Sequence, residues 1–302
     1  MSTSTAIQKR IQLLKQEYNR LKAGKDSLLR IIDEAEIPES VYNSNAIENS
    51  TLTLKETEKI LLEMEVSRNV SLREVFEAKN LARIMEYIQT ERVLFFGNKS
   101  SDELSKETLL LLHQMLLGNI DESIAGRLRK KGEYVRIGTF IAIAPEHVER
   151  MLEEVLIEYS SNHISYFVDK ISRFHLQFET IHPFNDGNGR IGRVLINYQL
   201  YKLGFPGIII RDKEKTAYYR SFGEYRDDKQ TKTIERIISL ALMEALHKRI
   251  AYLKGSKIIE ASEYAAKQKK PVTVILNAAK RQTIPAFREK GVWKIGAELL
   301  LI

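Results

Sequence analysis

The sequence contains no cysteine, which excludes both a disulfide framework and a thiolate metal site. It also lacks any apolar run approaching the roughly 18 residues that a membrane-spanning helix needs. Its first residues, Met1–Thr5, are not the basic region followed by an apolar stretch that marks a secretory signal. Among the six histidines, His175 and His182 share no ligand spacing with a pair of carboxylates, so no zinc site is expected. These absences predict a soluble, cytoplasmic protein without membrane contact.

Positive charge is concentrated at one end of the chain. The 302 residues carry a net charge of +7, and residues 253–302 contain ten Lys and Arg against four Asp and Glu, a local excess of six. Basic charge gathered at one end predicts an acidic partner for that end. The length allows two or three domains.

The stretch from His182 to Arg193, HPFNDGNGRIGR, has the features of an anion site. Gly187 and Gly189 bracket Asn188, so the backbone can turn tightly and approach a ligand with no Cβ in the way. After Gly189 the apolar residues recur at helical spacing. A glycine-rich loop that leads into a helix presents free backbone N–H groups and the positive end of the helix dipole. The stretch therefore predicts a phosphate site.

Charged side chains of the same stretch complete this pattern. Arg190 and Arg193 lie one turn apart, so both guanidinium groups can reach one polyphosphate. Asp186 is an oxygen ligand of the kind that Mg²⁺ prefers, and His182 can act as a general base near neutral pH. Each residue alone has a simpler explanation, such as a turn, a packed histidine or a solvated helix face. Their combination within one loop favours a catalytic site.

The spacing HxFx(D/E)GNGRxxR resembles the signature of the Fic family, and the chain matches it at every specified position. The resemblance covers about residues 70–250 and implies a mainly α fold, an all-helical Fic core with a short β-hairpin flap. It also implies a protein adenylyltransferase, which uses ATP and Mg²⁺ to move AMP onto a Ser, Thr or Tyr hydroxyl of a target protein. Relatives that transfer phosphate or phosphocholine leave another phosphoryl-type transferase as an alternative.

The resemblance also implies a role for each residue of the motif. His182 would take the proton from the target hydroxyl, and Asp186 would be the metal ligand. Phosphate binding would fall to Gly187, Asn188, Gly189, Arg190 and Arg193. Phe184 would anchor the loop in the core.

A second, shorter motif lies far upstream at Ser44, Glu48 and Asn49. On their own these residues could be a helix cap and a solvated carboxylate. They match the form (S/T)xxxE(G/N), which resembles the inhibitory motif of the Fic class with an N-terminal inhibitory helix. The resemblance implies that Glu48 pairs with Arg193 and takes the place of the γ-phosphate. In some family members the same glutamate supports removal of AMP, so a de-AMPylase stays open.

The remaining pattern predicts mostly helices. Residues 6–36 have the spacing of one long amphipathic helix, which Pro38 would end. Residues 52–117 contain no proline and predict three helices, the last of them, Leu104–Leu117, buried all round. Further helices are expected over 146–158, 166–181 and 233–253.

Residues 133–144 break the helical pattern and predict a β-hairpin, which we call the flap. A surface hairpin without a role is one interpretation. The Fic resemblance implies instead that a target protein pairs its backbone along the flap, and that Val135, Arg136, Ile137 and Gly138 line the nucleotide. The resemblance also suggests that Tyr218 packs against the adenosine; a buried core tyrosine is the competing interpretation.

The basic tail predicts two short helices, 260–269 and 272–281, and a hairpin over 283–295 that turns at Lys290-Gly291. This order resembles an excisionase-type winged helix-turn-helix, which implies DNA binding through residues 257–302. A basic interaction or dimerisation module is the alternative, so a DNA-binding regulator and a homodimer both stay open. We expect three domains: residues 1–69 with the inhibitory helix, the catalytic domain 70–253, and the module 257–302.

Overall fold

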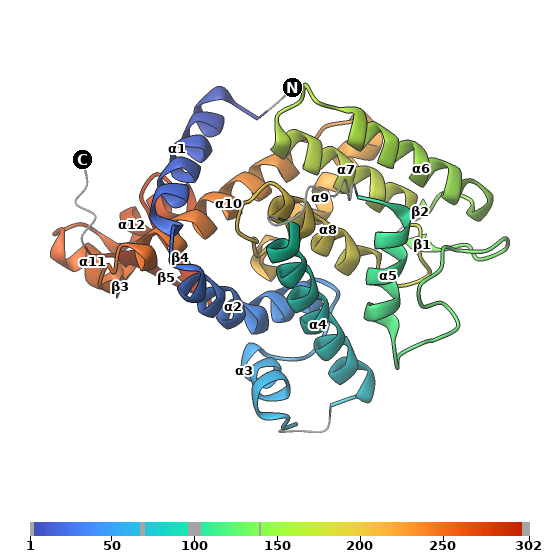
Figure 1. The fold of residues 1–302 in the computed structure, drawn as a ribbon, viewed down its shortest axis with the longest axis horizontal. Helices are drawn as coiled ribbons and strands as arrows, with labels where there is room; N and C mark the ends of the chain where they lie inside the picture. The colour runs from blue at the N-terminus through green and yellow to red at the C-terminus, as the bar shows by residue number, and fades with distance from the viewer. Residues whose placement is uncertain (1–2, 67–69, 96–103, 139, 298–302) are drawn as a thin grey trace.

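The first two helices form one arm of the molecule. The computed structural model describes residues 3–66, 70–95, 104–138 and 140–297, and Figure 1 shows α1 (Thr5–Lys22) leading into α2 (Asp26–Ile47). The prediction of one helix over 6–36 that ends at Pro38 was wrong. The break falls at Gly24, whose φ of +72° suits glycine at a helix end. Pro38 lies inside α2. The hydrogen bond that it removes is outweighed because Val41 and Ile47, beyond it, are buried in two apolar clusters.

The predicted helices of residues 52–117 are present. They are α3 (Leu54–Glu58), a π-helical turn (Lys59–Glu63), α4 (Leu72–Phe95) and α5 (Lys106–Leu117). A capping box between Thr53 and Glu56 starts α3. The expectation that residues 104–117 are buried all round was wrong, because Leu111 is 42% exposed. One face of α5 therefore lies at the surface.

Helix α8 (Asn188–Lys202) is the centre of the fold. It packs against α2, α4, α5 and α7 (Phe167–Ile181). The remaining elements of this region are α6 (Pro145–Ser161), a 3-10 turn (Asp212–Glu214), α9 (Lys215–Asp228) and α10 (Lys232–Leu253). One apolar cluster includes Val194 and Leu195 of α8, and a second includes Ile196 and Leu200. Since both cores pack on α8, its first turn is held rigidly. No helix in the described ranges is long and apolar enough to cross a membrane.

The flap is a short antiparallel hairpin, as predicted, with strands β1 (Arg136–Ile137) and β2 (Phe140–Ile141). A backbone hydrogen bond from Ala142 to Val135, 2.9 Å long, extends the pairing by one step. Thr139, at the tip, lies outside the described residues.

The C-terminal module, described here over residues 257–297, has the predicted order of helix, helix and hairpin. Its elements are β3 (Ile258–Glu260), α11 (Ala261–Lys267), α12 (Val272–Lys280), β4 (Ala286–Glu289) and β5 (Val292–Gly296). The strands pair in the order β3-β5-β4, and the hairpin turns at Lys290 and Gly291. Strand β3 was not predicted, because three residues are too few for a period-two pattern. The module has its own apolar cluster, which includes Tyr264, Ile275 and Ile295.

Buried ion pairs fasten the module to the preceding helices. Arg288 of β4 pairs with Glu244 of α10 at 2.6 Å. The backbone N–H groups of Lys290 and Gly291 donate to the carboxylate of Glu39 on α2, at 3.0 and 3.1 Å. Figure 1 shows the module (orange to red) beside α1 and α2 and the flap at the opposite end. The module therefore contacts the helix that leads to Glu48.

Candidate active site

His182 follows the last turn of α7 in a left-handed conformation, with φ 53° and ψ 63°. Arg129 fixes this helix end, because its guanidinium donates to the backbone oxygens of His182, Ile181 and Ile143 at 2.8, 3.2 and 2.7 Å. The Nδ1 atom of His182 lies 3.4 Å from the backbone oxygen of Glu179 and 3.8 Å from its carboxylate. Burial lowers the pKa of His182 to about 4. The imidazole is therefore neutral at pH 7 and can accept a proton.

Three side chains hold the loop after His182 in place. Phe184 is fully buried and stacks on His113, with ring centroids 3.8 Å apart. The side-chain amide of Asn188 binds both backbone groups of Phe184, at 2.9 and 2.8 Å. The N–H of Gly126 donates to Nδ1 of His113 at 3.0 Å, so Nε2 carries the proton and donates to the backbone oxygen of Asp186 at 3.1 Å. Burial lowers the pKa of His113 to about 4, which keeps this tautomer neutral.

The loop enters α8 through Gly187, whose φ is +80°. A Cβ at Gly187 would lie 2.7 Å from Cδ2 of Leu116, so only glycine fits here. The first-turn N–H groups of Asn188, Gly189 and Arg190 have no acceptor within their own helix. Together with the helix dipole they supply the donors that an anion site needs, and binding of an anion here stays a prediction.

Asp186 lies in a chain of alternating charges beside this helix end. Its carboxylate accepts hydrogen bonds from Arg73 of α4 and, at 3.2 Å, from Arg190. Glu77 pairs with the same two arginines, at 3.0 Å each. Burial alone would raise the pKa of Asp186, but Arg190 and Arg73 outweigh it and hold the pKa below its usual value. Asp186 is therefore ionised at neutral pH.

Arg193 is bound to the end of α2. Its Nε donates to the Ser44 hydroxyl at 2.9 Å, and its Nη2 donates to the Ser44 backbone oxygen at 2.8 Å and to the Glu48 carboxylate at 2.9 Å. The same Glu48 oxygen stands over Gly189, where a Cβ would meet it at 2.3 Å. Glu48 thus lies directly above the first turn of α8.

Two residues of α9 hold the backbone around Glu48. Lys215 donates to the backbone oxygen of Ala46 at 3.2 Å and to the Asn49 side chain at 2.8 Å. The Tyr219 hydroxyl donates to the backbone oxygen of Ile47 at 3.0 Å. A cation at the C-terminal end of a helix also complements its dipole. The end of α2 is therefore held from α9 as well as from Arg193.

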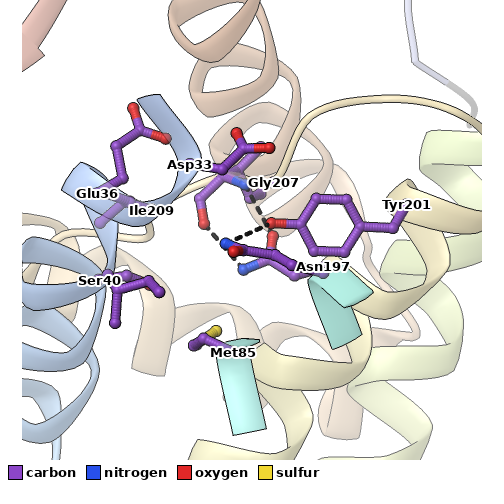
Figure 2. A pocket seen from close by; sticks show the side chains of 11 residues that line it. Asp33, Glu36, Ser40, Met85, Asn197, Tyr201, Gly207 and Ile209 are labelled. Carbon is purple, nitrogen blue, oxygen red and sulfur yellow. Dashed lines mark hydrogen bonds between the residues drawn. The ribbon is translucent and has the colours of Figure 1, made fainter. Parts of the chain in front are cut away.

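Midway along α2, packing against the core is incomplete. Figure 2 shows a small cavity between α2, α4, α8 and the segment 207–209. Its labelled lining residues are Asp33, Glu36, Ser40, Met85, Asn197, Tyr201, Gly207 and Ile209. A second small cavity continues from Ser40 to Ser44 and Arg193.

The structure does not support the predicted contact of Tyr218 with adenosine. The ring of Tyr218 is fully buried, and its hydroxyl lies 2.9 Å from Nε2 of His175 and 3.4 Å from Arg193. The competing interpretation, a core tyrosine, is the one that the structure shows. Its hydroxyl stabilises Arg193 from below.

The flap is tied to the loop through its base. Arg129, which binds the His182 backbone, also donates to the backbone oxygen of Glu133 at 3.0 Å. The predicted nucleotide-lining residues 135–138 lie in the hairpin itself, where the Arg136 side chain donates to the Gly138 oxygen at 2.9 Å. Their contact with a nucleotide stays a prediction.

Several residues of the site were missed by sequence reasoning. They are Arg73, Glu77, His113, Arg129, Lys215 and Tyr219. Only His113 gave a signal, as a polar residue within an otherwise apolar stretch. The others lie on distant elements with ordinary surface-like sequences, and the fold brings them to the loop.

Comparisons with known proteins agree with this arrangement. Residues 103–200 match the Fic/DOC family. The chain is 32% identical over 211 residues to the protein adenylyltransferase fic-1 of Caenorhabditis elegans, covering 69% of this chain and 40% of that protein. It is 28% identical over 299 residues to the protein adenylyltransferase Fic of Drosophila erecta, covering 94% of this chain and 57% of that protein. The chain thus spans about half the length of these curated relatives.

Solved structures show the same fold. A Fic domain containing signaling protein from Bacteroides thetaiotaomicron superposes with a TM-score of 0.71 at 26% identity, covering 82% of this chain and 98% of that chain. A Fic family protein from Desulfovibrio desulfuricans shares the fold over 100% of this chain and 99% of that chain, with a TM-score of 0.65 at 19% identity. From the motif loop on α8, the mainly helical fold and these matches, we conclude that the chain contains a Fic/DOC family domain at residues 103–200.

Proposed function

We propose that this chain is a protein adenylyltransferase, which transfers AMP from ATP to a hydroxyl group of a target protein. The observation that carries the proposal is the convergence of a neutral histidine, an ionised carboxylate and free backbone N–H groups at the N-terminus of α8. The names of the curated relatives support the same reaction.

The phosphates of ATP would bind at the first turn of α8. The N–H groups of Asn188 and Gly189 point at this position, and Arg190 and Arg193 lie on either side of it. Arg193 would bind the γ-phosphate with the same guanidinium that now holds Glu48. Preorganised donors of this kind stabilise charge that develops in the transition state.

The donor set also fits Mg²⁺. Magnesium is usually held by one or two protein carboxylates, with phosphate oxygens and waters as its other ligands, and Asp186 supplies one carboxylate. Bound there, the ion would neutralise the phosphates and the pyrophosphate leaving group. The Asp186 oxygen would first be released by Arg73, which already pairs with Glu77 at 3.0 Å and keeps that partner.

The protein's own proton step falls to His182. Its Nδ1 faces Glu179, so Nε2 is the nitrogen left to take the proton from the attacking hydroxyl. The target backbone would lie along the flap, held in register by main-chain hydrogen bonds. Arg129 would keep flap and base in register, because it binds the backbone of both.

The pair of Glu48 and Arg193 would inhibit this reaction. The Glu48 carboxylate occupies the guanidinium that the γ-phosphate needs, and it stands over the first turn of α8. A phosphate that entered would meet a like charge there. With Glu48 in this position, ATP would be excluded or would bind with its α-phosphate turned away from His182.

Transfer of labelled AMP in a lysate tests the proposal. Glu48→Gly should raise labelling by about 10-fold to 100-fold. It removes one partner of a partly buried charge pair, and each tenfold in labelling corresponds to about 1.4 kcal/mol. His182→Ala in the same background should abolish labelling, whereas the exposed His163→Ala should leave it unchanged. Labelling that survives His182→Ala would refute the assignment, and a mass increase other than that of AMP would favour phosphate or phosphocholine transfer.

We also propose, as a separate property, that the C-terminal module binds DNA through α11, α12 and the turn between them. Lys267 and Lys280 on these helices and Lys269 and Lys270 in the turn are exposed, whereas Arg288 in the hairpin is paired with Glu244. A salt-dependent shift of DNA that is lost on combining Lys269→Glu and Lys270→Glu, but kept in Lys213→Glu, would support it. Equal binding by all variants would contradict it.

A further inference from the structure

We infer that Glu179 is a positioning residue for His182: it holds the Nδ1 side of the imidazole and stabilises the imidazolium that forms when Nε2 takes the target proton. The inference rests on the proposed function, because it assigns a partner to the proposed base.

The first observation is the place of Glu179 on α7. It lies one turn before His182, and both its backbone oxygen and its carboxylate face the Nδ1 atom, at 3.4 and 3.8 Å. Two acceptors on one nitrogen favour the tautomer in which Nδ1 carries the proton. The Nε2 atom then has the free electron pair that proton abstraction requires.

The second observation concerns the buried space around the Glu179 carboxyl group. Its side chain is 5% exposed, and its Oε1 atom has no hydrogen-bond partner among the described residues. A Cβ at Gly192 of α8 would lie 2.5 Å from this oxygen and 2.9 Å from the His175 ring. The glycine at position 192 therefore leaves space for the carboxyl, and a buried acid with an unused oxygen needs a role other than folding.

The third observation is the basicity of His182. Burial lowers its pKa to about 4, and the nearby Arg129 lowers it further. A base works best when its pKa is close to the working pH, so an isolated imidazole with this pKa would be inefficient at pH 7. A negative charge beside Nδ1 is the kind of neighbour that raises it, and Glu179 can supply one.

The charge state of Glu179 depends on groups from several elements. Burial and then Glu48 of α2 raise its pKa to about 8, while Arg193 of α8 opposes them. His175 of α7 lies beside it and stays neutral, since burial lowers its pKa to about 3. Of the other groups, Asp186 acts on His182 rather than on Glu179, and burial keeps the Tyr218 hydroxyl of α9 protonated by raising its pKa.

The hydroxyl proton moves to Nε2 of His182 as the target oxygen bonds to the α-phosphate and the bond to pyrophosphate breaks. The imidazolium then carries protons on both nitrogens, and the one on Nδ1 faces the ionised Glu179 carboxylate. With Glu179 protonated, this stabilisation is lost. The rate should therefore rise with pH as Glu179 ionises near pH 8.

The experiment compares Glu179→Gln with its parent in the Glu48→Gly background, which reports transfer without inhibition. The parent should show a transfer rate that rises with pH as Glu179 ionises, at a lower pH than in the wild type because this background lacks the Glu48 charge that raises the pKa of Glu179. Glu179→Gln cannot ionise, so it should lose the rise and fall about 10-fold below its parent at pH 9. The exposed Glu154→Gln on α6 is the matched control and should keep the parent profile. A Glu179→Gln profile with the same rise as the parent would overturn the inference.

A second measurement is independent of AMP transfer. Nitrogen NMR of the His182 imidazole, in the full-length wild-type chain without ATP, should show Nδ1 protonated at pH 7 and a shift of both nitrogens near pH 8. A proton on Nε2, or no change near pH 8, would overturn the inference even if transfer occurs. The expected spectrum, together with a Glu48→Gly variant that transfers no AMP, would refute the proposed function and leave the Glu179 contact intact. If Glu179→Gln fails to fold, this measurement on the wild-type chain still tests the inference.

Discussion

Two carboxylates on the same arm, Glu39 within α2 and Glu48 at its end, are held in different ways. Glu39 has a side chain that is 7% exposed; it accepts hydrogen bonds from Arg211 and from the backbone N–H groups of Lys290 and Gly291. Glu48 is 34% exposed, and its ion-pair partner is the side chain of Arg193. Backbone groups of the C-terminal module hold Glu39, whereas a single guanidinium holds Glu48.

This difference separates a permanent attachment from a replaceable one. Backbone donors at the hairpin turn cannot leave Glu39 unless the module moves. Arg193, by contrast, has a guanidinium that a phosphate can bind as well as a carboxylate can. One small cavity borders α2 at Ser40 (Figure 2), and another reaches Ser44 and Arg193, so packing is incomplete from the middle of α2 towards its Glu48 end. The contrast can be tested by perturbing each end in turn.

Lowering the pH should weaken both attachments of α2 at once and have the largest effect on the free energy of unfolding. Burial lowers the pKa of three histidines around the loop from His182 to Arg193, namely His113, His175 and His182, to about 4, 3 and 4, and that of His247, which contacts Gln282 of the module, to about 4. Unfolded histidine takes up a proton at about pH 6.5. The stability from the neutral form is thus present above pH 6.5 and lost as pH falls from 6.5 toward 4, by about 1.4 kcal/mol per histidine and pH unit.

Urea unfolding at pH 7.0, 6.0 and 5.5 would measure this loss. The change of the free energy of unfolding with pH should be smaller in His247→Asn, by about one proton in four. His247 is the histidine that contacts the C-terminal module, through Gln282. The exposed His163→Asn is the control and should not change it. If His247→Asn left this pH dependence unchanged, the C-terminal module would not contribute to the loss of stability in acid.

Glu39→Ala should give the next largest effect, a loss of about 3–5 kcal/mol in the free energy of unfolding. The substitution leaves Arg211 with one buried partner fewer and the N–H groups of Lys290 and Gly291 without an acceptor. Glu34→Ala, on the exposed side of the same helix, should change it by less than about 0.5 kcal/mol. Equal losses for the two variants would contradict the assigned attachment.

Glu48→Ala should cost much less stability, about 1 kcal/mol or less, because its side chain is partly exposed and screened by solvent. The same variant should strongly raise AMP transfer. Chemical denaturation and a labelling assay on one preparation would report both quantities. If Glu48→Ala destabilised the protein as much as Glu39→Ala, the two ends would not differ and the comparison would fail.

Ser44→Ala should have the smallest effect. It removes one hydrogen bond to Nε of Arg193 but leaves the backbone oxygen of Ser44 and the Glu48 pair in place. A bond of this kind is worth about 1 kcal/mol, which corresponds to a rise in AMP transfer of about fivefold. Ser40→Ala, one turn earlier and facing the cavity, is the matched control. A larger rise for Ser40→Ala would argue against the role of Ser44.

The sequence was sufficient where function depends on consecutive residues. The loop from His182 to Arg193 could be predicted because glycine, arginine and aspartate occur at fixed spacing in one segment; phosphate and metal binding there stay predictions. The short motif at Ser44 and Glu48 could be recognised only together with that loop. The predicted pair of Glu48 and Arg193 is present at 2.9 Å, although the two residues lie 145 positions apart.

Other parts of the fold depend on contacts that no local pattern carries. Arg73 and Glu77 have the spacing of an ordinary helix surface. Arg73 reaches Asp186 and Glu77 reaches Arg190 only because α4 packs on α8. The end of the first helix was placed at Pro38 and not at Gly24, since proline is the stronger local signal and burial beyond it could not be seen. Tyr218 was ambiguous for the same reason.

That proline has a mechanical consequence. Pro38 immediately precedes Glu39, and its missing N–H leaves the backbone oxygen of Glu34 without its helical donor, so α2 bends most easily beside its fixed attachment. The nine steps from Glu39 to Glu48 span about 13 Å along the axis at 1.5 Å per residue. A tilt of about 10° at this pivot would carry the Glu48 carboxylate about 2 Å, comparable to the length of the bond it makes with Arg193. A small bend at Pro38, where the C-terminal module holds α2, would thus displace Glu48 relative to Arg193.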